Sequence, residues 1–230
     1  LIISAHTFEH IDDPKSQLQR LIQAAEPGAL FVVEVPGFDS LLNSCRFDQV
    51  FHQHIQYFSL ASFRRMIADI GGEYLTHTFN YSYWGGTMLV AFKKSASANG
   101  GSCCVGITGP TPELVHQQYR AFKDQLDRLG QTIDNLKQIP IYGFGAAQMV
   151  PTIAYHLDSD LSFLTCVLDD DPDRAGYTYP SLQVWTRQPD PDLDLSGTAV
   201  LVTALDSLRP ILPRLISLQP RHILVPLNML

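Results

Sequence analysis

Two histidines lie close together in the segment RFDQVFHQHIQYFS, residues 46–59, which shows neither a helical nor a strand period. An imidazole with its ordinary pKa of about 6.5 can accept a proton at neutral pH, and a neighbouring amide or hydroxyl can fix its tautomer. We therefore predict that His54 serves as a general base toward a carbonyl substrate, with Gln53 as an orienting neighbour.

Two other interpretations of this segment stay open. His52 and His54 are two positions apart, so on an extended chain they face the same side and form a candidate metal pair. No third ligand follows at tight spacing, so we expect no metal site in this chain. The segment is also compatible with a polar connection that leads to a helix cap at Ser59.

A second polar cluster, SAHTFEHIDDP, follows the apolar run LIISA at residues 1–5, which is expected to be a buried strand. Open α/β sheets place ligand-contacting groups at the carboxyl ends of their strands. His6, Glu9 and His10 are therefore candidates to face a pocket. The alternative is a polar loop that caps the next helix.

Glycines mark two further candidate regions. In YWGGT, residues 83–87, the pair Gly85-Gly86 predicts a tight turn or a close backbone approach, and a ligand wall that includes Tyr83 is the alternative. YGFGAAQ, residues 142–148, is a partial dinucleotide fingerprint with Gly143 and Gly145.

Three acids, Asp169 to Asp171, follow this glycine turn at about the distance expected for a ribose-binding carboxylate. A two-glycine turn is nevertheless typical of any strand-to-helix turn whose amides hold a phosphate, or of one that holds nothing. Both interpretations of the turn remain open.

The elements that position these residues alternate between short apolar runs and amphipathic stretches, which is typical of an α/β structure. Residues 94–112 are rich in small residues and form the candidate linker, and an amphipathic helix is expected from about Glu113 to Lys137. In the last 90 residues, this alternation predicts a parallel sheet of Rossmann type. The other expected elements are strands at 29–36, 73–81, 85–94, 161–168, 198–205 and 221–228, and helices around 18–25, 59–71 and 207–218.

Composition and charge argue against some classes of protein. The chain has 230 residues, 45% of them apolar, and 16 basic against 23 acidic residues, for a net charge of −7. No basic run stands out, so we expect no nucleic-acid partner, and no apolar stretch reaches the roughly 20 residues that a membrane span needs. The spacing of the four cysteines fits neither a zinc ribbon nor a redox pair, which favours reduced thiols in a cytoplasmic protein.

The chain begins with Leu1, directly inside an apolar run. We therefore expect a fragment of a longer protein. A sheet that lacks its early strands has unpaired edges, so residues 1–93 are expected to be less stable than the last domain or to associate with another copy.

Several stretches, in this order, resemble the later part of the sugar C-methyltransferase family, the S-adenosylmethionine-dependent enzymes that methylate a nucleotide-linked keto-deoxysugar at carbon. The matching stretches are HTFEHIDDP, VEVPGFDSLL, RFDQVFHQHIQYFS, YWGGT, IYGFGAAQ and VLDDDPDRAGYTYP. The combination of Phe47-Asp48-Gln49 with His54 and Phe58-Ser59 is the most specific of these matches.

The resemblance implies a fold class and a domain order. Residues 1–93 would be the C-terminal half of a class I methyltransferase sheet, which is Rossmann-like. Residues 94–138 would be a linker and a connecting helix, and residues 139–230 a second Rossmann-like α/β domain. The family's zinc-binding module, and with it the zinc, would belong to the part that precedes this chain.

The resemblance also implies roles for individual residues. His54 matches the proposed base, Gln53 stands where the family carries a glutamate, and Phe51 stands where a tyrosine is common. Ala147-Gln148 replaces a lysine after the glycine turn. The implied cofactor contacts are His6, Glu9 and His10, and the implied substrate contacts are Tyr83, Gly85, Gly86, Gly143 and Gly145.

The resulting hypothesis is an S-adenosylmethionine-dependent C-methyltransferase that acts on a nucleotide-linked keto-deoxysugar or a related small ketone. Two alternatives belong to other classes. One is an NAD(P)-binding oxidoreductase module centred on Gly143 and the acids that follow it, and the other is a non-catalytic protein that binds a nucleotide-sugar.

Overall fold

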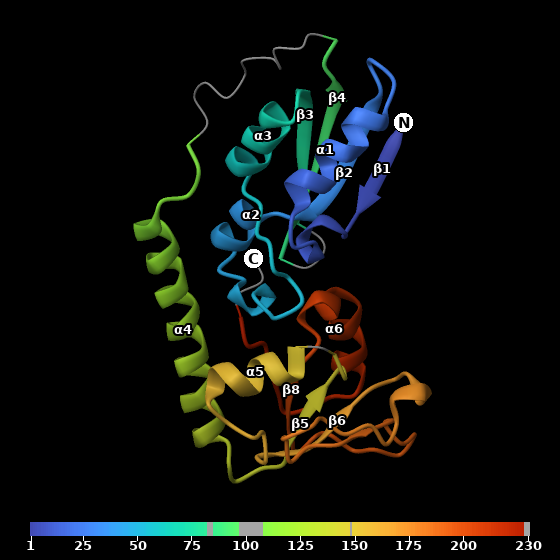
Figure 1. Cartoon of the computed structure of the whole chain (residues 1–230). Coiled ribbons are helices and arrows are strands. Elements are labelled where there is room, and N and C mark those ends of the chain that lie inside the picture. The colour runs from blue at the N-terminus through green and yellow to red at the C-terminus, as the bar shows by residue number, and fades with distance from the viewer. Residues whose placement is uncertain (82–84, 97–107, 148, 228–230) are drawn as a thin grey trace. The chain divides into compact units, whose positions relative to one another are not determined.

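The computed structural model describes residues 1–81, 85–96, 108–147 and 149–227. These residues form two compact units, Leu1–Tyr119 and Arg120–Leu230 (Figure 1). Each unit is built around its own sheet. The division falls inside helix α4, Pro112–Asn135, which lies close to the predicted helix. The domain boundaries expected at residues 93 and 139 stay predictions.

The first unit contains a four-stranded sheet in the order β1-β2-β4-β3. Strand β1 is parallel to β2, whereas β4 runs antiparallel to both β2 and β3. The two strands expected at 73–81 and 85–94 thus form an antiparallel pair, and β3 lies at the sheet edge. The strands are β1 (Ile2–Ala5), β2 (Leu30–Pro36), β3 (Gly72–Asn80) and β4 (Thr87–Lys94).

Helices α1 (Pro14–Ala24) and α3 (Leu60–Asp69) pack on this sheet and confirm two predicted helices. Asp13 caps α1 by accepting a hydrogen bond from the Ser16 amide, and Ser59 caps α3. Because alternate residues of a strand point to one face, the same face of β2 and β4 meets both helices. The buried residues of this core include Leu18, Ile22, Phe31, Val33, Val35, Phe63, Ile67, Met88, Val90 and Phe92.

Strand β1 differs from its prediction as a buried strand. It pairs only with β2 among the described strands, and its residues alternate between partly buried and exposed. Leu1 is 77% exposed and Ile3 is 68% exposed. Apolar composition predicted the strand correctly but not its burial, because burial depends on which elements cover each face.

Three short helices among the described residues of the first unit were not expected from the sequence. They are the 3-10 helix η1 (Phe8–His10), helix α2 (Phe38–Asn43) and the 3-10 helix η2 (Phe47–Gln49). The last of these gives the segment 46–59 a helical turn that its pattern did not show. Runs of three to six residues are too short for a helical period to be recognised.

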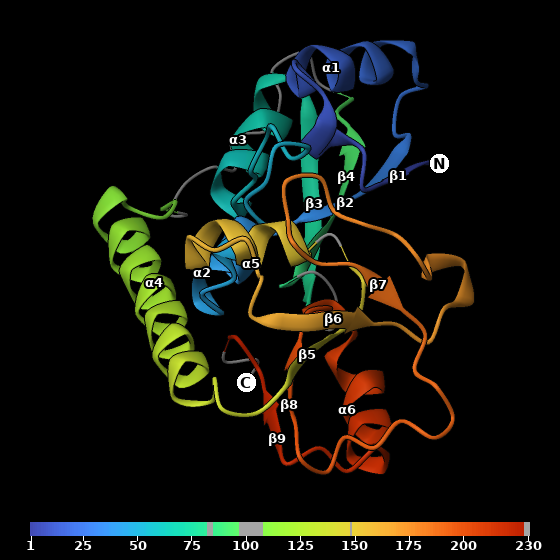
Figure 2. The same cartoon turned by 90° about the horizontal axis from the view of Figure 1, so that it is seen from below.

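The second unit contains a five-stranded sheet in the order β7-β6-β5-β8-β9, and all four pairings are parallel. Figure 2 shows the strands in this order. The central strand comes first in sequence and the order reverses there, which is the arrangement of a doubly wound Rossmann-like sheet. The strands are β5 (Ile141–Phe144), β6 (Leu164–Leu168), β7 (Thr186–Arg187), β8 (Ala199–Val202) and β9 (His222–Leu224).

The connections of this sheet include helices α5 (Met149–Leu157) and α6 (Leu208–Ser217) and the 3-10 helices η3 (Pro172–Arg174) and η4 (Leu205–Ser207). Helix α6 was predicted, but β7 was not, because a two-residue strand leaves no pattern. All four residues of β8 are buried, as expected for a central parallel strand. The mixed α/β class with Rossmann-like sheets is therefore confirmed.

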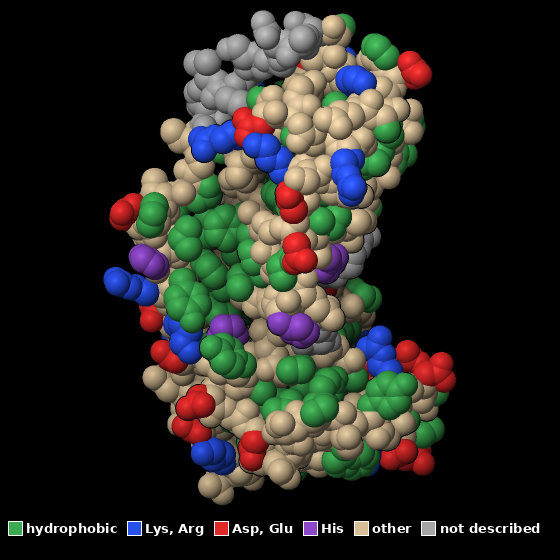
Figure 3. Space-filling view, in the orientation of Figure 1, with side chains coloured by type: hydrophobic (Ala, Val, Ile, Leu, Met, Phe, Trp, Pro, Cys, Tyr) green, Lys and Arg blue, Asp and Glu red, His purple; other side chains and the backbone are tan. Residues whose placement is uncertain are grey.

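The surface carries charges of both signs. On the face shown in Figure 3, acidic and basic side chains are interspersed, and neither forms a continuous patch. No helix within the described residues is long and apolar enough to cross a membrane.

Candidate functional site

The two histidine-containing segments meet in the first unit, although more than 40 residues separate them in sequence. The backbone amides of Ile55 and Gln56 both donate to the carbonyl of Glu9, at 3.0 and 3.1 Å. The Nδ1 atom of His10 lies 2.7 Å from the backbone carbonyl of Gln53. Segment 6–10 and segment 53–56 therefore form one hydrogen-bonded cluster at the carboxyl end of β1.

The end of β1 determines how the first segment turns. His6 adopts a left-handed backbone with φ 49°, and its amide donates to the carbonyl of Glu34 in β2 at 3.0 Å. The next turn buries Phe8, which is only 2% exposed, in the core beneath the sheet. This anchor places the adjacent Glu9 side chain inside the protein and leaves His10 at the rim.

Glu9 is buried, with 1% of its side chain exposed. Its Oε1 lies 3.3 Å from Nδ1 of His6 and 3.8 Å from Nε2 of His10. Neither carboxylate oxygen has a hydrogen-bond partner among the described residues. A buried carboxylate without partners is costly, so this position favours a positively charged or proton-sharing neighbour.

His54 is half-buried beside the same carboxylate. Its ring lies 4.2 Å from that of Phe51 and 5.0 Å from that of His10, measured between ring centroids. Burial lowers the pKa of His54 to about 4, and the charge of His10 acts in the same direction, whereas a backbone hydrogen bond with Gln49 opposes both. The imidazole is therefore neutral at pH 7 and holds a lone pair, and its buried Nδ1 makes no hydrogen bond to the part of the chain that the structure describes.

The neighbours of His54 take different positions. Gln53 is exposed and contributes its backbone carbonyl to His10, so it orients that ring through the main chain. His52 is exposed and lies outside the cluster that Glu9, His10 and His54 form. The His52–His54 pairing that sequence spacing suggested is thus replaced by a contact between His10 and His54.

Tyr57 is a site residue that sequence reasoning did not single out. Its hydroxyl accepts a hydrogen bond from the Phe51 amide at 3.2 Å, and its ring lies 6.4 Å from that of His54. Burial raises the pKa of Tyr57. Position 51 is a phenylalanine without a hydroxyl, and the sequence signal for Tyr57 was that segment 46–59 contains a tyrosine.

The motif residues 46–49 are buried and support the site from beneath. Arg46 donates from Nε and from an η nitrogen to the two carboxylate oxygens of Asp48, at 2.7 and 2.8 Å, and Gln49 donates to Asp48 at 3.0 Å. Arg46 and Asp48 are each 2% exposed. A bidentate pair of this kind holds the turn η2 in one geometry, and His54 follows from it along the chain.

Gly85 and Gly86 form a close backbone approach. A Cβ atom on Gly85 would lie 2.8 Å from the Cβ of Arg46, and one on Gly86 would lie 2.4 Å from the Cβ of Ser40. Both glycines also have positive φ. Their conformation and packing account for them without a ligand, and Tyr83 lies outside the described residues.

Gly143 and Gly145 belong to the second unit, at the carboxyl end of β5. A Cβ on Gly143 would lie 2.9 Å from Val167, and one on Gly145, where φ is 98°, would lie 2.3 Å from the Cβ of Ala204. The turn therefore needs glycine for close packing of β5 against its neighbours. Whether it also contacts a substrate stays a prediction.

The acids that follow β6 all form ion pairs. Asp169 accepts hydrogen bonds from the amides of Ala146 and Asp171, at 2.6 and 2.9 Å, and lies 3.2 Å from Arg174. The Asp170 carboxylate pairs with Arg214 at 3.2 Å. Asp169 thus stands where a ribose-binding acid would be, but its two oxygens are engaged with the glycine turn and with Arg174.

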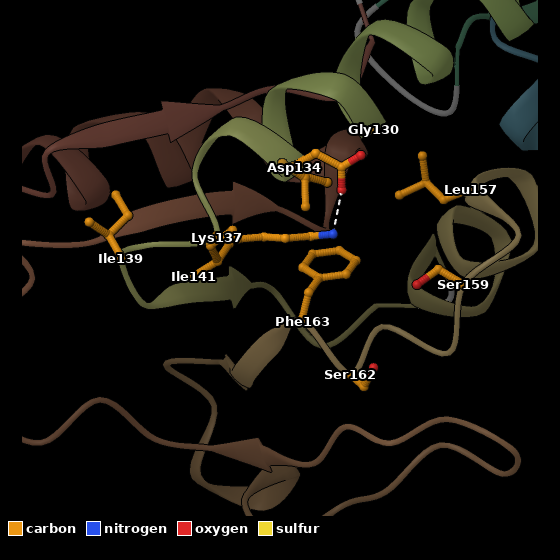
Figure 4. A pocket seen from close by; sticks show the side chains of 10 residues that line it. Gly130, Asp134, Lys137, Ile139, Ile141, Leu157, Ser159, Ser162 and Phe163 are labelled. Atoms are coloured by element: carbon orange, nitrogen blue, oxygen red, sulfur yellow. Dashed lines mark ion pairs between the residues drawn. The ribbon is translucent and has the colours of Figure 1, made fainter.

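The structure has a cavity of about 610 Å³ in the second unit, at the amino end of β5. Figure 4 shows it between α4 and the loop before β6, with the Lys137–Asp134 ion pair at 2.7 Å and the ring of Phe163 beside it. A second cavity, of about 620 Å³, is lined by residues of α4, α6 and β9. None of the predicted site residues lines either cavity.

The mixed α/β fold is consistent with a methyltransferase domain. Residues 1–77 match the family model described as a methyltransferase domain. This match covers β1, β2, α3 and most of β3, and it includes Glu9, His10 and His54.

Over 100 residues the chain is 33% identical to the C-methyltransferase NovU of Streptomyces niveus. The aligned part is 43% of this chain and 23% of that protein, so the chain matches about a quarter of the length of this curated relative. Both similarities support a methyltransferase.

Proposed function

We propose that this chain is part of an S-adenosylmethionine-dependent C-methyltransferase that acts on a nucleotide-linked keto-deoxysugar or a related small ketone. The observation that carries the proposal is the meeting of His54 with segment 6–10, at the carboxyl end of β1, within the part that matches a methyltransferase domain. The similarity to a C-methyltransferase supports carbon as the accepting atom.

The chemistry of Glu9 fits a cationic cofactor. Its carboxylate is buried, and its oxygens have no hydrogen-bond donor within the described residues. S-adenosylmethionine carries a sulfonium and an ammonium group, and when bound it supplies an electrophilic methyl group. We assign His6, Glu9 and His10 to the cofactor side of the site and His54 to the substrate side.

In the proposed reaction His54 takes a proton from the carbon beside the ketone. The electron pair of the broken C–H bond would be held as an enolate, whose carbon would take the methyl group that a bound S-adenosylmethionine supplies, with the neutral thioether as the leaving group. His54 is neutral at pH 7, so its lone pair is available. Its lowered pKa makes it a weak base, so it can take this proton only where the enolate oxygen is stabilised as it forms.

The other residues of the cluster position this base. Gln53 fixes His10 through its carbonyl, and Phe51 packs against the ring of His54. Tyr57 is the nearest candidate for the substrate hydroxyl contact that Phe51 lacks. Tyr83, Gly85, Gly86, Gly143 and Gly145 remain proposed substrate contacts.

The oxidoreductase alternative has weaker support. A nicotinamide dinucleotide needs a free carboxylate for its ribose at the end of the second strand of the Rossmann unit. Asp169 occupies that position, and its oxygens already accept from Ala146, Asp171 and Arg174. A non-catalytic nucleotide-sugar-binding protein is an outcome of the test below.

The test measures methyl transfer by the protein that carries this chain. S-adenosylmethionine with a labelled methyl group is incubated with a panel of nucleotide-linked keto-deoxysugars, and the products are analysed for a new carbon–carbon bond. We expect label at a carbon next to the ketone. Transfer to oxygen or nitrogen, or sugar binding without any transfer, would contradict the proposal.

The variant His54→Phe removes both ring nitrogens but keeps an aromatic ring against Phe51. We expect it to lower kcat by about 100-fold or more, in line with the loss of a general base, while binding of the cofactor changes little. The matched control is His52→Phe, which makes the same change on an exposed ring two positions away. Equal losses in both variants would argue against a role for His54.

A further inference from the structure

Three side chains of the cluster bring metal-binding atoms together. Glu9, His10 and His54 each offer one ligand atom, and these three atoms lie within 4.8 Å of one another. The set is one carboxylate oxygen and two imidazole nitrogens, from two segments of the chain. Such a set suits zinc and the neighbouring transition metals.

Two observations point to a ligand in this cluster. The Glu9 carboxylate is buried, with only 1% of the side chain exposed, and its oxygens lack hydrogen-bond partners in the described part of the chain. The Nδ1 atom of His54 is likewise buried without a partner there. Burial of polar atoms without hydrogen-bond partners is costly, and a cation bound to the Glu9 carboxylate would offset that cost.

The orientation of His10 supports the same conclusion. A carbonyl can only accept, so the 2.7 Å contact with Gln53 requires the proton to be on Nδ1 of His10. In the neutral ring the lone pair then lies on Nε2, the atom 3.8 Å from Glu9 Oε1. A carbonyl that fixes the tautomer of a ligating histidine in this way is the usual outer shell of a metal site.

We propose that Glu9, His10 and His54 bind a divalent transition-metal ion such as Zn²⁺. Three protein ligands leave the fourth tetrahedral position to water or to another ligand. Bonds of about 2.0–2.1 Å place tetrahedral ligands roughly 3.4 Å apart. The cluster reaches this spacing when its widest separation of 4.8 Å closes by side-chain rotation.

This site overlaps the proposed catalytic base. A neutral imidazole has one lone pair, and a metal ion that coordinates His54 occupies it. The metal-bound form therefore cannot accept a proton at His54, so the ion would inhibit the proposed methyl transfer and a chelator would restore it. Metal binding itself rests on the geometry of this chain alone and holds whether or not the proposed function is correct.

The test titrates the metal-free chain with Co²⁺ and records the visible absorption of the bound ion, followed by competition with Zn²⁺. We expect saturable binding of one ion per chain, with the strong visible absorption of a four- or five-coordinate cobalt site. Glu9→Gln, His10→Asn and His54→Phe should each weaken binding by about 10-fold or more. Asn at position 10 can keep the hydrogen bond to the Gln53 carbonyl while it removes the Nε2 ligand.

The matched control is His52→Phe, which should bind Co²⁺ as the unmodified chain does. Circular dichroism of each variant checks that the fold is retained. Loss of binding in His52→Phe, with binding retained in Glu9→Gln and His10→Asn, would overturn the proposal in favour of a site formed by His52 and His54. Absence of saturable binding would also overturn it, as would a thiolate-to-cobalt absorption band, which indicates cysteine ligands.

Discussion

The imidazole of His10 donates a hydrogen bond from Nδ1 to the backbone carbonyl of Gln53, across 43 positions of sequence. This bond ties the turn after β1 to the segment that carries His54. It also leaves Nε2 of His10 directed at the Glu9 carboxylate. The proposed function and the proposed metal site both depend on this junction, in which three ionisable side chains share a partly buried space.

The buried pair of Arg46 and Asp48 should contribute strongly to stability. Asp48→Asn removes the charge that compensates a guanidinium of which only about 2% is exposed, so we expect a loss of about 3 kcal/mol in the free energy of unfolding. The control Asp69→Asn breaks the exposed pair with Lys15 and should cost less than about 1 kcal/mol. Urea unfolding measures the free energy of unfolding of both variants. Equally small losses in the two would contradict a strong contribution from the buried pair.

A side chain at Gly145, in the turn after β5, should destabilise the protein. Gly145→Ala combines a positive φ with a 2.3 Å approach to Ala204, so we expect a loss of at least about 2 kcal/mol. Gly130 lies in α4, and a Cβ atom added there would meet nothing within 4 Å, so Gly130→Ala should stabilise the protein by up to about 1 kcal/mol. Thermal unfolding of the two variants checks this contrast, and a neutral Gly145→Ala would contradict it.

Tyr179 should make the stability of the second unit fall at alkaline pH. Burial raises the pKa of Tyr179 to about 12, above the ordinary value of 10.0. The unfolded chain therefore loses this proton first, and the stability that the neutral hydroxyl contributes is present below pH 10 and is lost as pH rises from 10 toward 12. Tyr179→Phe should flatten the stability profile in that window.

The near-ultraviolet absorbance of phenolate follows this titration directly. Burial also raises the pKa of Tyr57, so at least two tyrosines of the folded protein should ionise later than in the unfolded chain. Tyr179→Phe should remove the step near pH 12, and a step there that persists in the variant would assign it to another tyrosine.

Most of the fold followed from local patterns in the sequence. The helical spacing of Phe63, Met66 and Ile67 predicted α3, and the apolar run 29–36 predicted β2, because both patterns reflect one buried face. Strand β7 has two residues and left no pattern. The run at residues 1–5 predicted a strand but not its exposure, which depends on neighbours rather than on composition.

The site was predicted only in part, because its residues come from segments that are distant in sequence. The residue types identified His54 and Glu9 as separate candidates. No local sequence pattern indicated that their segments are hydrogen-bonded to each other. The spacing of His52 and His54 suggested a pair, whereas the fold gives His54 a different partner, His10. Likewise, the distance to Asp169 suggested ribose binding, although Arg174 and the Ala146 amide engage it.

Deuterium exchange into the substrate tests the role of His54 most directly. The protein that carries this chain is incubated in deuterated water with a nucleotide-linked keto-deoxysugar, without a methyl donor, and exchange at the carbon beside the ketone is followed by NMR. We predict exchange well above the enzyme-free rate with the unmodified protein and with His52→Phe, and only the enzyme-free rate with His54→Phe. Equal exchange in all three proteins would contradict the assignment of His54 as the base.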